Sequence, residues 1–153
     1  MNYKYYKVYL NILKYINIYN ILIKMSCLFN SLSYFVSENS TELRQKICDY
    51  LETNPNLMDN MSASQVIYFE NGQNLKDYIN NMRSTSTWGG AIEIKCFCNI
   101  YNKNVFVRNI RDRTSSIIEF IINPKIIKNR FNCDENNFHI TWSGGHYEPV
   151  RSI

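Results

Sequence analysis

Residues 26–36 read SCLFNSLSYFV, and apolar side chains recur in this stretch at the three- and four-residue spacing of a helix. Leu28 and Leu32 fall on one stripe, and Ser26 is a residue type that commonly caps the N-terminus of a helix. The pattern predicts a helix that begins near Ser26 and carries Cys27 in its first turn. A thiol there faces the positive end of the helix macrodipole, which lowers its pKa and favours the thiolate. The commoner role of a free cysteine is a buried structural one, which position alone favours for Cys27.

Further helices are predicted downstream of this stretch. Asn39 followed by Glu42 resembles a capping box, and the helix that it starts is ended by the Thr-Asn-Pro sequence at 53–55. Helical spacing of apolar residues appears again in residues 75–82 and 94–101. The alternation of polar and apolar residues in the last of these stretches would also suit a strand, and we prefer the helix.

The C-terminal third of the chain is rich in β-branched and aromatic residues. Such runs predict strands, which we place at residues 105–110, 117–122, 138–142 and 147–150. The Ser-Gly-Gly sequence at 143–145 would join the last two as a hairpin. Because the helices come first and the strands later, the order predicts an α+β domain with N-terminal helices followed by an antiparallel-rich sheet.

A histidine and an acid lie in the last of these strands. His146 opens the strand, and the two-residue period places Glu148 on the same face, with Tyr147 on the other. A carboxylate at that place can orient the imidazole, as a thiol nucleophile requires of its base. The alternative is a surface His-Tyr-Glu sequence without function. His139, the other histidine, is expected to be a strand-face residue.

The charge of the chain is unevenly distributed. Residues 1–37 hold four lysines and no acid, which accounts for the whole net charge of +4. The remaining residues carry 13 Lys and Arg (17 − 4) against 13 Asp and Glu, so they offer no basic face for nucleic acid. Nucleic acid is therefore not an expected partner.

The five cysteines are too few, and odd in number, for the disulfide framework of a small secreted protein. We expect reduced thiols and a cytoplasmic location. Cys96, Cys98, Cys133 and His139 together could suggest a metal site, but their spacing is not that of a zinc finger. No metal and no cofactor are expected.

Residues 1–23 differ in composition from the rest and are rich in Tyr, Ile and Asn. We interpret them as a non-catalytic N-terminal extension of a domain that spans residues 24–153. The alternative is an amphipathic helix that packs on the domain. Lys14 and several asparagines interrupt the segment, so it predicts neither a membrane-spanning helix nor a signal peptide. A membrane partner is not expected, although attachment to a membrane surface is a further hypothesis.

Four segments resemble, in the same order, the motifs of the ovarian-tumour (OTU) family of cysteine proteases. The nucleophile motif is similar to Cys27-Leu28-Phe29-Asn30-Ser31-Leu32, the second helix to residues 43–51, the central signature to residues 78–82 with Thr87-Trp88-Gly89-Gly90, and the closing histidine motif to Trp142 with residues 145–150. The resemblance covers residues 26–150. Each segment is weak by itself, but four in order are a specific match.

The resemblance implies a papain-like fold and hydrolysis of the isopeptide bond after the C-terminal glycine of ubiquitin or a ubiquitin-like protein. By the same resemblance Cys27 is the nucleophile, His146 activates its thiol and protonates the leaving amine, and Glu148 orients His146. Trp88 is expected to support the fold. Conjugates of ubiquitin or a ubiquitin-like protein are the expected partners, and a monomer is the expected state.

The chain departs from the family directly before the nucleophile. The family usually has Asp-Gly-Asn in this loop, which shapes the oxyanion hole, and this chain has Lys24-Met25-Ser26. The change removes a flexible glycine and replaces an acid by a base. Two hypotheses follow: an active deubiquitinase, or a catalytically impaired pseudoenzyme that serves as a ubiquitin-binding module.

Overall fold

The structure is a computed structural model that describes residues 25–151. The predicted extension at residues 1–23, and Lys24, lie outside the described residues. The elements are, in chain order, α2 (Cys27–Ser33), α3 (Ser40–Glu52), β1 (Asn56–Met58), β2 (Met61–Ser62), α4 (Ala63–Asn71), α5 (Leu75–Met82), α6 (Ala91–Tyr101), β3 (Asn104–Asn109), β4 (Ile117–Phe120), the 3₁₀ helix η1 (Pro124–Ile126), β5 (Asn137–Trp142) and β6 (Tyr147–Pro149).

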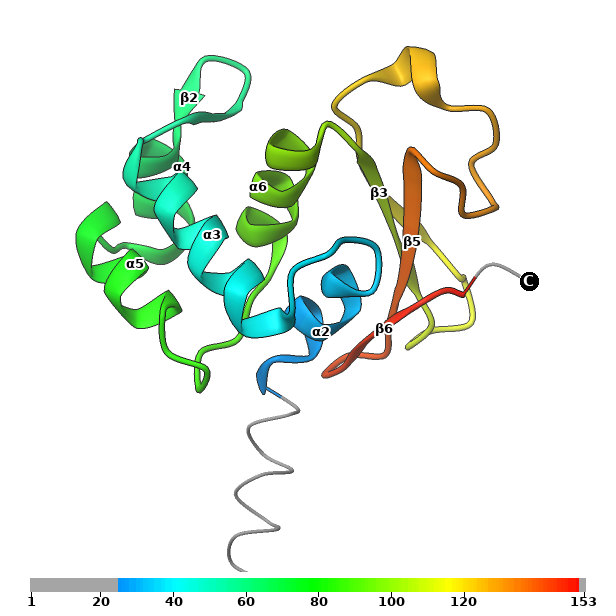
Figure 1. Cartoon of the computed structure of the whole chain (residues 1–153), viewed down its shortest axis with the longest axis horizontal. Helices are drawn as coiled ribbons and strands as arrows, with labels where there is room; N and C mark the ends of the chain where they lie inside the picture. Colours follow the sequence, from blue (N-terminus) through cyan, green and yellow to red (C-terminus); the bar gives the residue numbers. More distant parts are fainter. Residues whose placement is uncertain (1–24, 152–153) are drawn as a thin grey trace, which may run out of the picture.

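Helices α3 to α6 lie on one side of the molecule and the sheet of β3 to β6 on the other, with α2 between them (Figure 1). The turn that joins β5 to β6 lies beside α2, and α2 contacts β6. Helices precede the main sheet in the chain and are segregated from it, which confirms the predicted α+β class. No helix in the described part of the chain is long and apolar enough to span a membrane.

The predicted helices are present as α2, α3, α5 and α6. At the start of α3 the Asn39 Oδ1 accepts hydrogen bonds from the N–H groups of Thr41 and Glu42, each at 3.0 Å. The Glu42 carboxylate in turn accepts the N–H of Asn39 at 3.0 Å, which completes the predicted capping box. The preference for a helix over a strand in residues 94–101 is also confirmed.

Helix α4 and the short hairpin of β1 and β2 were missing from the prediction. Signals for α4 exist in the sequence, because Ser62 and Gln65 form a capping box and Ala63, Val66 and Ile67 form a buried stripe. The exposed aromatic pair Tyr68 and Phe69 follows directly, so four apolar residues stand in a row and hide the helical period.

The four-stranded sheet has the order β4-β3-β5-β6. The predicted antiparallel pairing holds for β3 with β4 and for β5 with β6, but β3 and β5 are parallel. The reason is the route of the chain: after β4 has paired with one edge of β3, residues 121–136 carry the chain to the opposite edge. A parallel pair needs a crossover of this kind, about a dozen residues or longer.

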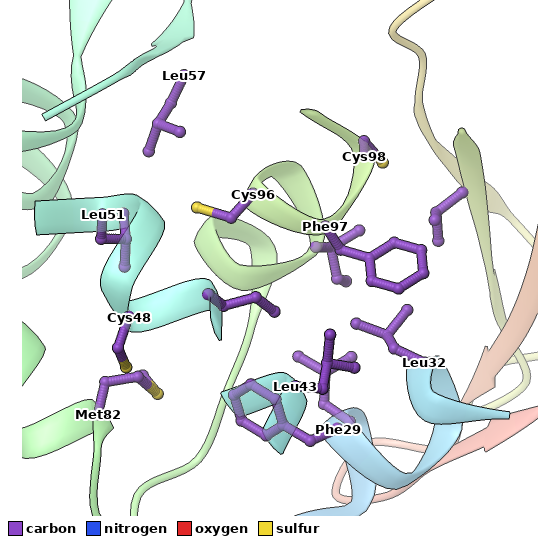
Figure 2. Close-up of a cluster of buried hydrophobic side chains, with 14 of the residues drawn as sticks. Phe29, Leu32, Leu43, Cys48, Leu51, Leu57, Met82, Cys96, Phe97 and Cys98 are labelled. Carbon is purple, nitrogen blue, oxygen red and sulfur yellow. The ribbon is translucent and has the colours of Figure 1, made fainter. Parts of the chain in front are cut away.

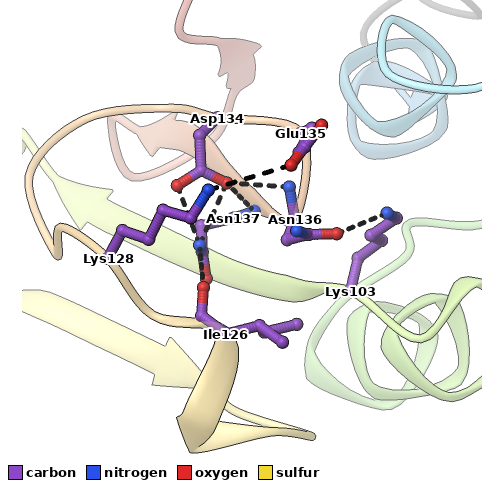
Figure 3. A network of polar contacts seen from close by, with 7 residues as sticks. All are labelled: Lys103, Ile126, Lys128, Asp134, Glu135, Asn136 and Asn137. Atoms are coloured by element: carbon purple, nitrogen blue, oxygen red, sulfur yellow. Dashed lines mark hydrogen bonds and ion pairs between the residues drawn. The ribbon is translucent and has the colours of Figure 1, made fainter.

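Buried asparagines fix this crossover at the ends of β3 and β5. Asn104 and Asn137 are in register, both fully buried, and Asn104 Nδ2 donates to Asn137 Oδ1 at 2.9 Å. Asn104 Oδ1 accepts the N–H groups of Ile122 and Asn123. Asn137 Nδ2 donates to the Asp134 carboxylate and to a carbonyl of η1, as Figure 3 shows. Irregular backbone is therefore held by side-chain amides.

The apolar core fixes α2 from two sides. Phe29 and Leu32 are fully buried and point toward Leu43 of α3 and Phe97 of α6 (Figure 2). The Phe97 ring in turn contacts the Phe138 ring of β5, with centroids 6.1 Å apart. Truncating a buried phenylalanine to alanine costs about 3–5 kcal/mol, so this packing holds α2 firmly.

Replacing Asn104 should destabilise the domain. In Asn104→Ala the half-buried N–H groups of Ile122 and Asn123 and the buried Oδ1 of Asn137 lose their partner, and a buried polar group left unpaired costs about 1–3 kcal/mol. We expect the free energy of unfolding, measured by urea denaturation, to fall by about 3 kcal/mol. Lys128→Ala is the control: its ion pair with Glu135 is exposed at 3.9 Å, so the change should stay within about 0.5 kcal/mol. Equal effects would contradict the assigned role of Asn104.

Candidate active site

Cys27 is the first residue of α2, and its side chain is buried, at 2% exposure. The Sγ atom accepts a hydrogen bond from the backbone N–H of Tyr147, at 3.4 Å. Two segments 120 residues apart in the chain are thereby brought into contact. The sequence offered no signal for this contact, because a backbone donor has no side-chain signature.

His146 and Glu148 flank Tyr147 at the start of β6. The Nε2 of His146 lies 3.4 Å from the Glu148 Oε1, so the two side chains share a face, as the strand period predicts. Both are open to solvent, with side-chain exposures of 41% and 68%. The predicted turn at 143–145 is present, and the Ser143 N–H donates to the His146 carbonyl at 3.0 Å.

Tyr147 connects the thiol to the segment of the imidazole, because its N–H contacts the Cys27 Sγ and it directly follows His146. Within residues 25–151 no hydrogen bond joins the Cys27 Sγ to the His146 ring, and the thiol is held by the Tyr147 N–H. Because the Nε2 of His146 faces Glu148, its Nδ1 is the nitrogen left to exchange a proton with the thiol. The ring is exposed and can reorient, and catalytic hydrogen bonds commonly tighten only when substrate is bound.

Burial raises the pKa of the Cys27 thiol, and it outweighs the N–H groups of Tyr147, Leu28 and Cys27 itself, which lower the pKa. The N–H groups at the start of the helix do lower this pKa, as expected, but the cost of burial is larger and the net shift is upward. Helix α2 has only seven residues, so its dipole is small, while the loss of hydration on burial is nearly complete. A raised pKa favours the protonated thiol at neutral pH.

The loop before the nucleophile is described from Met25 onward. Ser26 occupies the N-cap position of α2, but its side chain makes no capping hydrogen bond, which corrects the prediction. Its Oγ accepts a hydrogen bond from the Arg44 guanidinium at 3.3 Å and donates to the Thr85 carbonyl at 3.4 Å. Ser26 is therefore bound to other parts of the fold, not to its own helix.

The remaining thiols and His139 lie away from this site. His139 is buried in β5 and stacks on Phe106 with ring centroids 4.7 Å apart, a strand-face position as predicted. Cys96 and Cys98 are buried on α6, and their pKa values are raised by burial. Residues 25–151 hold no cluster of three or more His, Cys, Asp or Glu side chains that could bind a metal ion.

A cavity of about 1030 Å³ lies between α4, α5, α6 and β4. Its lining includes Val66, Tyr78, Trp88, Glu93 and Phe120, whereas Cys27 and His146 do not contribute to it. Trp88 was expected to support the fold, yet 46% of its surface is exposed here.

The comparison with protein families assigns the chain. The family described as OTU-like cysteine protease matches residues 26–147. The match includes nearly all of the described residues, and the chain belongs to the OTU-like cysteine protease family.

Solved structures share the fold at low sequence identity. An OTU domain in complex with ubiquitin is 23% identical, with a TM-score of 0.59 over 81% of this chain and 62% of that one. An OTU deubiquitinase from Wolbachia pipientis wMel is 19% identical, with a TM-score of 0.59 over 84% and 83%. The Hazara virus OTU bound to ubiquitin is 14% identical, with a TM-score of 0.62 over 85% and 77%. Comparison with curated proteins gave no match.

The raised pKa of Cys27 predicts how its alkylation depends on pH. Below the raised pKa the thiol stays protonated, and only the thiolate reacts with iodoacetamide. We expect the half-maximal rate of Cys27 alkylation, measured by peptide mass spectrometry, at a higher pH in the folded protein than in the guanidinium-unfolded chain. A half-maximal rate at lower pH in the folded protein would instead indicate a preformed thiolate–imidazolium pair.

Proposed function

We propose that this protein is a deubiquitinase that hydrolyses the isopeptide bond after the C-terminal glycine of ubiquitin or a ubiquitin-like protein. The observation that supports this best is the contact of the Cys27 thiol with the segment that carries His146 and Glu148. Membership of a cysteine protease family gives this contact a chemical meaning. The choice of ubiquitin is supported by OTU domains of the same fold that are bound to ubiquitin.

The reaction begins with transfer of the Cys27 proton to the Nδ1 of His146. The thiolate attacks the carbonyl carbon of the C-terminal glycine, and the resulting oxyanion collapses as the C–N bond breaks. His146 returns its proton to the leaving lysine amine, which leaves a thioester on Cys27. A water molecule, deprotonated by His146, then attacks the thioester and breaks its C–S bond. The glycine carboxylate is released, and the Cys27 thiolate takes the proton back from His146.

The raised pKa of Cys27 makes this base necessary. A thiol that stays protonated at neutral pH does not react without proton transfer, so His146 has to act in the attack as well as in the departure of the amine. The Glu148 carboxylate lies 3.4 Å from the Nε2 of His146, where it can orient the ring and stabilise the imidazolium that forms.

The segment Lys24-Met25-Ser26 is the proposed oxyanion loop. The proposal rests on the matching position in the family, directly before the nucleophile. The tie between Ser26 and Arg44 holds the end of this segment in one place, which suits a preorganised oxyanion site.

The proposed setting is a monomer in a reducing, cytoplasmic compartment. All five cysteines are free thiols, and four of them are buried. Lys and Arg balance Asp and Glu beyond residue 37, which favours a protein partner over nucleic acid or a charged membrane.

A ubiquitin with an electrophilic alkyne at its C-terminus tests the assignment of the nucleophile. We expect it to form one covalent adduct with the protein, on Cys27, and we expect Cys27→Ser to form none. Cys133→Ser is the matched control, because Cys133 is the least buried of the other thiols and should have no part in the reaction. A wild-type protein that binds ubiquitin but forms no adduct would favour the alternative function, a catalytically impaired ubiquitin-binding module.

His146 and Glu148 should contribute unequally to kcat. His146→Ala removes the general base and acid, and we expect kcat to fall about 10²- to 10⁴-fold with a fluorogenic ubiquitin substrate. Glu148→Gln removes an exposed charge at 3.4 Å, a pair worth about 1 kcal/mol or less, so kcat should fall by less than about tenfold. Equal losses in the two variants would assign Glu148 a direct catalytic role.

A further inference from the structure

Arg44 is a buried cation of α3 that the proposed reaction does not use. Its side chain is 1% exposed, and its guanidinium carbon lies 4.0 Å above the centre of the Phe29 ring. Among the described residues no carboxylate lies within ion-pair distance of it. Hydrogen bonds to uncharged oxygens take the place of an ion pair.

The three hydrogen bonds that the guanidinium donates to oxygen atoms reach two different segments. Nη1 donates to the carbonyls of Met82 and Thr87, at 2.9 and 3.0 Å, so it spans the loop between α5 and α6. Nη2 donates to the Ser26 Oγ at 3.3 Å. Ser26 precedes Cys27 directly, and its hydroxyl donates in turn to the Thr85 carbonyl of the same loop.

The loop between α5 and α6 also presses on the helix that carries Cys27. A Cβ on Gly89 would lie 2.9 Å from side-chain carbons of both Leu28 and Phe29, so only glycine allows this approach. Arg44 therefore ties α3 to the residue before the nucleophile and to the loop that packs on the nucleophile's helix.

Stability alone does not account for an arginine at this place. Glu93 interacts with Arg44 through its charge but does not lie at ion-pair distance. Burying a cation without a direct ion pair costs free energy, and an apolar side chain of similar volume is often neutral or stabilising in such a position. What an apolar side chain cannot supply is a planar set of donors that fits three oxygens at once. Such donors select one arrangement of the two segments.

We propose that Arg44 is a positioning residue, which holds Ser26 and the Thr87 region in the arrangement that keeps the Cys27 thiol enclosed and aligned. The catalytic part of this inference rests on the proposed function. Loss of Arg44 should loosen the segment at Ser26, expose the thiol and lower turnover, with the fold intact.

The first measurement is alkylation of individual cysteines in Arg44→Met, which needs no substrate. We expect Cys27 to react with iodoacetamide at least threefold faster than in wild type. Cys48 lies one turn from Arg44 on α3 and is fully buried, so it should stay protected and report on global unfolding. Arg83→Met is the matched control, because Arg83 ties the end of α5 to Gln45, Asp49 and Glu52 without touching Ser26. Its Cys27 rate should equal that of wild type.

The second measurement separates kcat from KM with the fluorogenic ubiquitin substrate. We expect Arg44→Met to lower kcat at least tenfold with KM within twofold, and Arg44→Lys to restore part of the loss. Ser26→Ala should lower kcat about threefold, and adding it to Arg44→Met should cost nothing more, since both act through one contact.

Each outcome decides the inference. Unchanged Cys27 alkylation in a folded Arg44→Met, or additive effects in the double variant, would overturn it. Where Arg44→Met exposes Cys48 as well, Ser26→Ala decides, because it removes the contact at the nucleophile while the guanidinium keeps its hydrogen bonds to Met82 and Thr87. A wild-type protein that cleaves nothing refutes the proposed function, while the alkylation rates still decide the structural role of Arg44.

Discussion

The N–H of Tyr147 reaches the Sγ of Cys27 because α2 is packed between the helices and the sheet, and the candidate site depends on this placement. Phe29 and Leu32 bury the face of α2 that points to α3 and α6, which directs Cys27 toward β6. Strand β6 pairs antiparallel with β5, so the position of His146, directly before β6, follows from the sheet. The apolar packing of α2 therefore determines which part of the β5–β6 hairpin the thiol contacts.

The same burial shapes the chemistry of the thiol. Desolvation raises the pKa of Cys27, which favours a protonated and less reactive thiol in the free protein. His146, in contrast, is open to solvent and paired only with an exposed acid. The site thus combines a fixed, buried nucleophile with a base that can still move. In such an arrangement substrate can complete the alignment, and the cost of exposing a thiolate is avoided in its absence.

Elements marked by local patterns were predictable from sequence, and contacts between distant segments were not. The capping box at Asn39, the apolar spacing of α5 and α6 and the four strands all have local signals and are present. The parallel pairing of β3 with β5 was missed because it depends on the crossover, whose buried asparagines resemble an ordinary polar loop in sequence. The deviation at Ser26 has the same origin: its partner is Arg44, far along the chain. One signal for Arg44 did exist, since it shares the helical stripe of Ile47, Cys48 and Leu51, where an apolar residue is expected.

Two sets of buried polar groups specify the path of irregular backbone, which apolar packing cannot do. Hydrophobic contacts are non-directional, so they bring layers together without specifying the path of irregular backbone between them. Asn104 and Asn137 specify that path where β3 and β5 begin, and hold the crossover that makes these strands parallel. Arg44 does so for the loop between α5 and α6 and for the residue before the nucleophile. Each set uses donors of fixed geometry whose loss leaves buried groups unpaired, so each penalises alternative arrangements more than it adds to the stability of the native one. In a domain whose candidate nucleophile and base come from opposite ends of the chain, the gain from such groups is precision of placement.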